Sequence, residues 1–221
     1  MSHKDWGDPV EIERAWKAAL VRIPNAEDKY IATTIDGLSD KKIKMIQGYP
    51  TVIYLHGCSG VTEGTYARIN FLATNGYAVI APISLARKKY PKSCDPAQKV
   101  AGLYRGTLKM RQHDAGYAIA KAKTLSWVDP NNVFLMGFSQ GGITTATFRS
   151  KSKLASVNAR VIEGWTCNAG WHEYKGIKAP KSEPVLSLVG ANDPWFQSSW
   201  TRGDCSSSLN KRNGSKSIVY K

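Results

Sequence analysis

Apolar residues fall along the chain into short continuous runs, separated by stretches in which they recur at helical spacing. The continuous runs are typical of buried strands, and they occupy residues 51–55, 77–81, 133–136, 160–164, 185–189 and 217–220. The helical patterns occupy residues 10–20, 64–75, 97–126 and 141–150, and a short helix is expected near residues 206–212. Strands that alternate with helices predict an α/β fold with a mostly parallel, doubly wound sheet that is covered on both faces.

Shorter patterns complete this outline. Two further strands are expected at residues 29–35 and 42–46, on either side of an Asp-Gly dipeptide that is typical of hairpin turns. Residues 84–96 are polar and contain two prolines, which favours a loop. No repeat, low-complexity segment or linker divides the chain, so we expect a single domain over residues 1–221 with a helical N-terminal extension over residues 1–28.

The composition is ordinary for a soluble globular protein, with 42% hydrophobic and 22% charged residues. The longest apolar runs, of about seven residues, are too short to span a membrane. The N-terminal residues lack the apolar core of a signal peptide, so we expect a cytoplasmic protein. An incomplete N-terminus would leave the periplasm or secretion open.

The chain is strongly basic, with 31 Lys and Arg residues against 17 Asp and Glu residues and a formal net charge of +14. The basic residues lie in small scattered groups, and no nucleic-acid-binding motif organises them. We therefore interpret them as a solvated surface and expect no specific nucleic-acid partner. Steering of anionic substrates or weak association with a polyanion stays an alternative, because such attraction needs no specific sequence.

The four cysteines, Cys58, Cys94, Cys167 and Cys205, are widely spaced and form no C-x-x-C motif, so no zinc site is expected. Each of the pairs Cys58 with Cys94 and Cys167 with Cys205 lies in loops that follow predicted strands. Two disulfides are therefore an alternative, and they would suggest an oxidising compartment. Buried free thiols are the favoured interpretation.

One motif indicates the class of reaction. Residues 133–142 read Val-Phe-Leu-Met-Gly-Phe-Ser-Gln-Gly-Gly, so an apolar strand leads into a G-x-S-x-G frame around Ser139. With a helix directly after it, this pattern predicts a nucleophile elbow, which exposes a serine hydroxyl for attack on an acyl group. Gly137 and Gly141 remove side chains that would clash at such a turn. Gln140 starts the helix, so its backbone N–H is expected in an oxyanion hole. A glycine-rich turn that happens to hold a serine is the alternative.

Two other loops at predicted strand ends supply partners for Ser139. The loop Leu-His-Gly-Cys-Ser-Gly is expected to give the second oxyanion N–H, from Cys58, while His56 is interpreted as a histidine held in place by loop hydrogen bonds. Asp193 also follows an apolar strand, so its carboxylate would lie at the same sheet edge as Ser139 and orient a catalytic histidine. An Asx turn before Pro194 is the alternative for this aspartate.

Together these motifs resemble the α/β-hydrolase fold and, within it, the dienelactone hydrolase family. The resemblance covers about residues 45–221 and rests on Val52-Ile-Tyr-Leu-His-Gly, Gly76-Tyr-Ala-Val-Ile-Ala-Pro, Val128-Asp-Pro, Gly137-Phe-Ser-Gln-Gly-Gly and Gly190-Ala-Asn-Asp. Dienelactone hydrolases proper use a cysteine nucleophile, so Ser139 indicates a relative of the serine esterase type. Only about twenty residues separate the strands expected at 160–164 and 185–189, so no large lid domain is expected there.

The resemblance implies a triad in the chain order Ser, Asp, His, with the histidine in the loop after the last strand. The four histidines, His3, His56, His113 and His172, all precede Asp193. The last predicted strand ends next to Lys221, so we expect that the chain is incomplete at its C-terminus. His172 is the internal substitute for the base, and His113 is interpreted as a packing residue of its helix.

The sequence therefore predicts a serine hydrolase that cleaves carboxylic esters or lactones through an acyl-serine intermediate. Ser139 would attack, Asp193 would orient the histidine, and the N–H groups of Cys58 and Gln140 would hold the oxyanion. The expected partner is a small-molecule ester, and no metal or cofactor is implied. The alternative function is a catalytically impaired hydrolase-fold binding protein that lacks the triad histidine.

Overall fold

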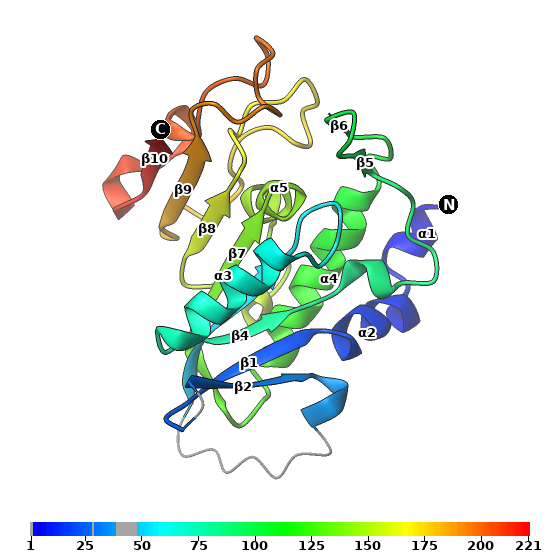
Figure 1. The fold of residues 1–221 in the computed structure, drawn as a ribbon, viewed down its shortest axis with the longest axis vertical. Helices are drawn as coiled ribbons and strands as arrows, with labels where there is room; N and C mark the ends of the chain where they lie inside the picture. Colours follow the sequence, from blue (N-terminus) through cyan, green and yellow to red (C-terminus); the bar gives the residue numbers. More distant parts are fainter. Residues whose placement is uncertain (1, 28, 39–47) are drawn as a thin grey trace.

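The computed structural model describes residues 2–27, 29–38 and 48–221. Its centre is an eight-stranded sheet in the order β10-β9-β8-β7-β3-β4-β1-β2 (Figure 1). The strands are β1 (Leu20–Asn25), β2 (Lys29–Thr34), β3 (Tyr49–Leu55), β4 (Ala78–Ala81), β7 (Val128–Phe138), β8 (Arg160–Glu163), β9 (Val185–Gly190) and β10 (Lys216–Tyr220). The strands from β10 to β4 pair in parallel, while β1 is antiparallel to both β4 and β2. The expected mostly parallel α/β sheet is confirmed.

Helices cover both faces of the sheet. They are α1 (His3–Trp6), α2 (Pro9–Lys17), α3 (Glu63–Thr74), α4 (Thr107–Ala122) and α5 (Gln140–Thr147). On one face, Trp16 of α2 and Ile119 of α4 join a buried cluster with Ile53 of β3 and its neighbours. On the other face, Ile69 of α3 packs on Tyr54 of β3. Because successive residues of β3 point to opposite faces, this single strand contributes to both cores.

The N-terminal segment differs from its prediction. The helix expected at residues 10–20 ends at Lys17, and Leu20 already begins β1. The apolar pattern continues across this boundary, so helical spacing alone does not show where the helix stops. The strand expected at 29–35 is present as β2, but it pairs with β1. The strand expected at 42–46 lies outside the described residues.

The long helix expected at residues 97–126 is also shorter, because α4 begins only at Thr107. A small hairpin of β5 (Cys94–Asp95) and β6 (Val100–Ala101) precedes it. Lys99 and Gly102 both have positive φ angles, of 54° and 75°, a backbone conformation that a helix does not accept. Near the C-terminus, two 3₁₀ turns (Ser206–Ser208 and Lys211–Asn213) replace the helix expected at 206–212.

The expectation of free thiols is wrong. Cys58 is bonded to Cys94 and Cys167 to Cys205, with Cα–Cα distances of 6.1 and 4.9 Å, and no cysteine is free. The reason lies in the topology. Cys58 follows β3 and Cys167 follows β8, and the long connections after β4 and β9 return to the same end of the sheet. Each pair therefore meets at the carboxyl edge of the parallel strands, within the range that a disulfide spans.

Candidate active site

Ser139 lies between β7, which ends at Phe138, and α5, which begins at Gln140. Its backbone angles are φ 55° and ψ −117°, in a region that residues with a side chain rarely adopt. Backbone hydrogen bonds on both sides hold this conformation: the Ser139 N–H donates to the Glu163 carbonyl at 2.9 Å, and the Ile143 N–H donates to the Ser139 carbonyl at 2.9 Å. The strained residue is thus fixed by β8 on one side and by its own helix on the other.

The flanking glycines are required by close backbone contacts. A Cβ atom added to Gly137 would lie 2.2 Å from the Gly141 carbonyl oxygen, and one added to Gly141 would lie 2.0 Å from the Leu55 carbonyl oxygen. Both distances are far below van der Waals contact. The strand–turn–helix geometry that the sequence predicts at residues 133–142 is therefore present. The role of Ser139 as nucleophile stays a prediction.

The two predicted oxyanion residues approach Ser139 from different elements. Cys58 follows β3, the strand next to β7, and a Cβ atom added to Gly57 would lie 3.8 Å from Cβ of Ser139. Gln140 is the first residue of α5, so its N–H has no acceptor within the helix. The structure therefore brings the Gly57-Cys58 loop and the start of α5 together beside the Ser139 side chain.

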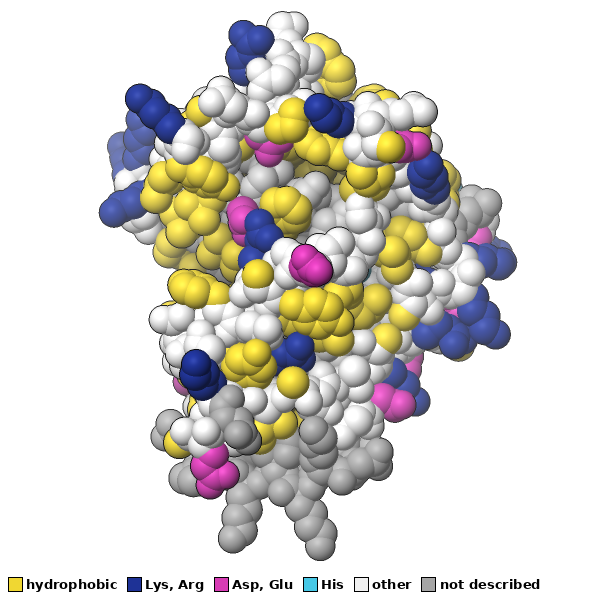
Figure 2. Space-filling model, viewed as in Figure 1, with side chains coloured by type: hydrophobic (Ala, Val, Ile, Leu, Met, Phe, Trp, Pro, Cys, Tyr) yellow, Lys and Arg dark blue, Asp and Glu magenta, His cyan; other side chains and the backbone are white. Residues whose placement is uncertain are grey.

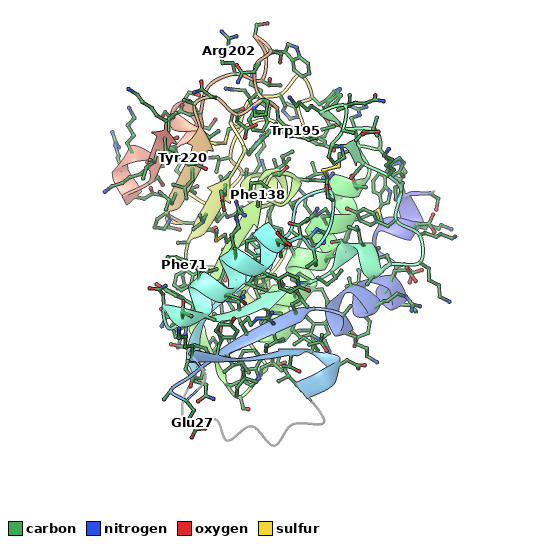
Figure 3. The ribbon with its side chains drawn as sticks, viewed as in Figure 1. Glu27, Phe71, Phe138, Trp195, Arg202 and Tyr220 are labelled. Carbon is green, nitrogen blue, oxygen red and sulfur yellow. A yellow bond between two sulfur atoms is a disulfide. The ribbon has the colours of Figure 1, made fainter. Side chains whose placement is uncertain are left out.

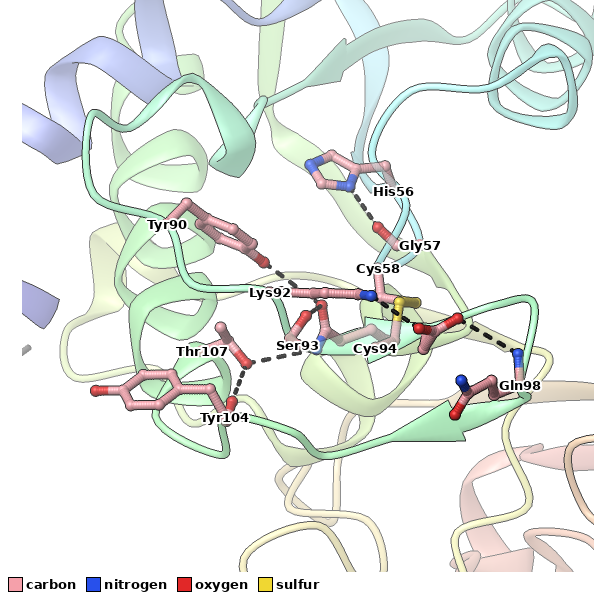
Figure 4. The surroundings of a disulfide bond; sticks show 12 residues. His56, Gly57, Cys58, Tyr90, Lys92, Ser93, Cys94, Gln98, Tyr104 and Thr107 are labelled. Atoms are coloured by element: carbon pink, nitrogen blue, oxygen red, sulfur yellow. Dashed lines mark hydrogen bonds and ion pairs between the residues drawn. A yellow bond between two sulfur atoms is a disulfide. The ribbon is translucent and has the colours of Figure 1, made fainter.

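A disulfide and a polar cluster support this loop (Figure 4). Cys58 is bonded to Cys94, and the hydroxyl of the neighbouring Ser93 donates to Oε1 of Gln140 at 3.2 Å. The Tyr90 hydroxyl donates to the same oxygen at 3.4 Å. The segment 90–94 therefore contacts both predicted oxyanion residues.

Asp193 follows β9, which is separated from β7 by β8 alone, so it lies at the same carboxyl edge as Ser139. Its Oδ1 accepts a hydrogen bond from the Trp195 N–H at 2.9 Å, so the Asx turn that the sequence offered as an alternative is present. The same carboxylate lines a cavity of about 240 Å³ together with Arg202. Figure 3 shows Trp195 and Arg202 in the loops beyond the ends of the strands. A turn role and a catalytic role are compatible, because the turn uses one carboxylate oxygen.

His56 is fully buried at the end of β3 and has both ring nitrogens engaged. Its Nδ1 donates to the Gly57 carbonyl at 2.7 Å, and its Nε2 accepts from the Ser84 N–H at 3.2 Å. Burial, with a smaller contribution from the nearby Arg111 charge, lowers the pKa of His56 to about 3. The ring is therefore neutral and structural, which agrees with the interpretation from sequence.

The other three histidines lie on different parts of the fold. His3 stacks on Trp6 with ring centroids 4.1 Å apart, and His113 of α4 lies against Gly7. Burial lowers the pKa of His113. His172 is exposed in the connection between β8 and β9. Among the hydrogen bonds of the described residues, none joins a histidine to Ser139 or Asp193.

Aromatic side chains surround the connection between β8 and β9. Trp165 is buried and packs edge-on against Phe196, with ring centroids 5.6 Å apart. Trp171 packs against Tyr174 in the same manner at 5.5 Å, while Trp200 is 56% exposed. The sequence did not show which of these aromatic side chains are buried and which are exposed, because all of them follow strands that end at the same edge of the sheet.

One buried residue of the site escaped the sequence analysis altogether. Arg111 of α4 is 1% exposed and donates hydrogen bonds to the side chain of Gln140 and to the carbonyls of His56 and Gly57. Its signal in the sequence is an arginine one turn before Asp114, on the face that the helix buries. Such a residue is buried only when it has partners.

The described residues also bear on metal binding and on membrane insertion. No group of three or more His, Cys, Asp and Glu side chains in this part of the chain is placed to hold a metal ion. No helix among the same residues has the length and apolar character needed to cross a membrane.

The comparison with protein families identifies the chain. The model of the dienelactone hydrolase family matches residues 36–219. The chain belongs to the dienelactone hydrolase family. Membership agrees with the resemblance found in the sequence, and it places the chain in a family of hydrolases with the α/β-hydrolase fold. A comparison with curated protein sequences found no significant match.

Solved structures of α/β-hydrolases have the same fold as this family member. A phospholipase/carboxylesterase from Dyadobacter fermentans is 20% identical with a TM-score of 0.53, covering 81% of this chain and 84% of its own. A dienelactone hydrolase-like promiscuous phosphotriesterase from metagenomic libraries is 20% identical with a TM-score of 0.52, covering 78% and 69%. Esterase 2 of Thermogutta terrifontis is 13% identical with a TM-score of 0.50, covering 93% and 83%. At these identities the likeness concerns the fold.

Proposed function

We propose that this dienelactone hydrolase family member is a serine hydrolase that cleaves carboxylic esters or lactones through an acyl-serine intermediate. The observation that carries the proposal is the strained backbone of Ser139 between β7 and the N-terminus of α5. This conformation costs free energy, and a strained serine between a strand and a helix is typical of a nucleophile elbow. The esterase and carboxylesterase names of the structural neighbours support an ester substrate.

Each predicted residue has a role in this reaction. The Ser139 hydroxyl attacks the acyl carbon, and the N–H groups of Cys58 and Gln140 stabilise the oxyanion that forms. Asp193 orients a histidine and stabilises its charged form. His172 is the candidate base among the four histidines, because it is exposed in the connection that leads from β8 toward Asp193.

The experiment measures hydrolysis of a p-nitrophenyl ester by the wild type and Ser139→Ala. We expect the substitution to lower kcat by at least about 10³-fold, since it removes the nucleophile. A fluorophosphonate probe should label the wild type and leave the variant unlabelled. Ser207→Ala, which changes an exposed serine in a 3₁₀ turn, is the matched control and should keep full activity. Unchanged turnover in Ser139→Ala would exclude the proposed nucleophile.

A second function is favoured by one observation, namely that no hydrogen bond among the described residues joins a histidine to Ser139 or Asp193. A hydrolase-fold binding protein would keep the pocket and lack the base. Such a protein would bind a small ester without turning it over and would not react with the probe. His172→Ala adds to the test: a large loss of kcat assigns the base to His172, whereas an unchanged rate removes that assignment.

A further inference from the structure

Arg111 of α4 is a buried cation. Its side chain is 1% exposed, and it takes part in none of the ion pairs among the described residues. Asp114, one turn further along α4, is paired with Arg87. Burying a charge in this way is costly unless other groups compensate it. The Asp114 charge compensates Arg111 in part, and the oxygen atoms to which Arg111 donates compensate it directly.

These oxygens belong to the two segments that carry the predicted oxyanion N–H groups. Nη1 of Arg111 donates to Oε1 of Gln140 at 3.0 Å and to the Gly57 carbonyl at 3.3 Å, while Nη2 donates to the His56 carbonyl. One guanidinium thus connects the loop after β3 to the first residue of α5. The planar fork of an arginine side chain can hold several acceptors at fixed angles, which a lysine cannot do.

The Gly57 carbonyl and the Cys58 N–H belong to the same peptide group. Because this group is planar and trans, its carbonyl and N–H point in opposite directions. Arg111 and Nδ1 of His56 both donate to the Gly57 carbonyl, so the Cys58 N–H is directed away from them. Hydrogen bonding at the carbonyl also polarises the peptide and strengthens its N–H as a donor.

The side chain of Gln140 is held in the same network. Its Oε1 accepts from Arg111 and from the Ser93 hydroxyl, and its Nε2 donates to the Thr107 hydroxyl at 3.4 Å. The residue is 6% exposed, so these contacts are shielded from water. Fixing this side chain fixes the start of α5 and with it the Gln140 N–H.

We propose that Arg111 is a positioning residue of the oxyanion hole. By contacting both segments at once, Arg111 holds the Cys58 and Gln140 N–H groups in place. This inference rests on the proposed function, and it adds a residue that contacts no substrate. It explains why a buried arginine of α4 donates to carbonyl and amide oxygens of both segments.

The test compares Arg111→Met and Arg111→Lys with the wild type in hydrolysis of a p-nitrophenyl ester, per folded molecule. We expect Arg111→Met to lower kcat by about 10²-fold, the loss typical of one oxyanion donor. KM should change by less than about threefold, because the ground state does not depend on the oxyanion contacts. Arg111→Lys should recover part of kcat, since it keeps the charge without the fork.

Arg160→Met is the matched control. Arg160 is also 1% exposed and also donates to backbone carbonyls, those of Thr145 and Phe148, but it lies at the far end of α5 and is paired with Glu183. This variant should lose stability and keep the kcat of the folded fraction. If Arg160→Met lost as much kcat as Arg111→Met, the effect of Arg111 on kcat would reflect general stabilisation of the fold, and the proposal would be overturned.

Amide hydrogen exchange gives a readout that does not need turnover. In Arg111→Met, exchange should quicken in peptides that contain Cys58 and Gln140, whereas in Arg160→Met it should quicken around residues 145–148. If the wild type hydrolyses no ester, the proposed function fails, and the exchange data still show whether Arg111 holds these segments. Unchanged exchange at Cys58 and Gln140 would overturn the positioning role, whatever the activity.

Discussion

At the scale of single residues, two residues of the same type can have very different surroundings. His56 and His172 both follow strands at the carboxyl edge, yet His56 is fully buried with both nitrogens bonded, and His172 is exposed. Local sequence indicated the structural role of His56 through its place at a strand end. The partners that enforce it, above all the Ser84 N–H, come from another loop.

His56 should make the stability of the protein depend on pH. Its pKa is about 3 when folded and about 6.5 when unfolded, so the unfolded state binds the extra proton between these values. The free energy of unfolding should therefore be fully retained above about pH 6.5 and fall as the pH decreases, by up to about 1.4 kcal/mol per pH unit for this group. In His56→Gln, urea unfolding between pH 5 and 7 should show a shallower dependence.

The control for this measurement is His113→Gln, because burial also lowers the pKa of His113. Each substitution should remove its own part of the pH dependence and leave the other part. An identical pH dependence in the wild type and His56→Gln would contradict a neutral, buried His56.

At the scale of elements, the sequence predicted what depends on local patterns and missed what depends on distant contacts. The strand–turn–helix around Ser139 was predictable because Gly137, Ser139 and Gly141 are close in the chain. The Arg111 network was not, because Arg111 and Gln140 are separated by 29 residues and Arg111 and His56 by 55. The helix predicted at 97–126 was too long, because Lys99 and Gly102 take positive φ angles at the hairpin that precedes α4.

The two disulfides form a matched pair for experiment, with sequence separations of 36 and 38 residues. Because loop length sets the entropy lost by the unfolded chain, Cys58→Ser with Cys94→Ser should cost about as much stability as Cys167→Ser with Cys205→Ser, roughly 4 kcal/mol. The first pair should also lower kcat per folded molecule more strongly, since Cys58 is a predicted oxyanion residue.

Thermal unfolding and ester hydrolysis of the two double variants check this expectation. Equal catalytic losses would mean that the Cys58–Cys94 bond has no special relation to the oxyanion hole.

Structural disulfides persist in oxidising compartments, so we infer that such a compartment suits the protein better than the cytoplasm expected from its N-terminal sequence.

At the scale of the whole molecule, the formal net charge is +14. Figure 2 shows Lys and Arg side chains in separate groups on the face in view, with apolar and acidic side chains between them. Such a distribution attracts polyanions without selecting one of them, because the attraction depends on summed charge and is screened by salt.

We expect the protein to bind heparin at low ionic strength and to elute as the salt concentration rises. Reversing two exposed charges in one group, Lys88→Glu with Lys89→Glu, should lower the elution concentration about as much as Lys151→Glu with Lys153→Glu in another. Elution from a heparin column measures both. A complete loss of retention in only one of these variants would reveal an organised anion site instead.

The placement of the two disulfides also bears on how the protein withstands cleavage. Each bond closes a loop of chain, residues 58–94 and 167–205, and the second loop contains Asp193. A protease that cuts one peptide bond inside either loop leaves the two fragments joined through sulfur. A nick between Ser139 and Asp193, anywhere from residue 168 onward, therefore cannot separate Asp193 from Ser139 until the bond is reduced. After such a cut, Ser139 and Asp193 therefore stay covalently connected only while the Cys167–Cys205 disulfide is intact.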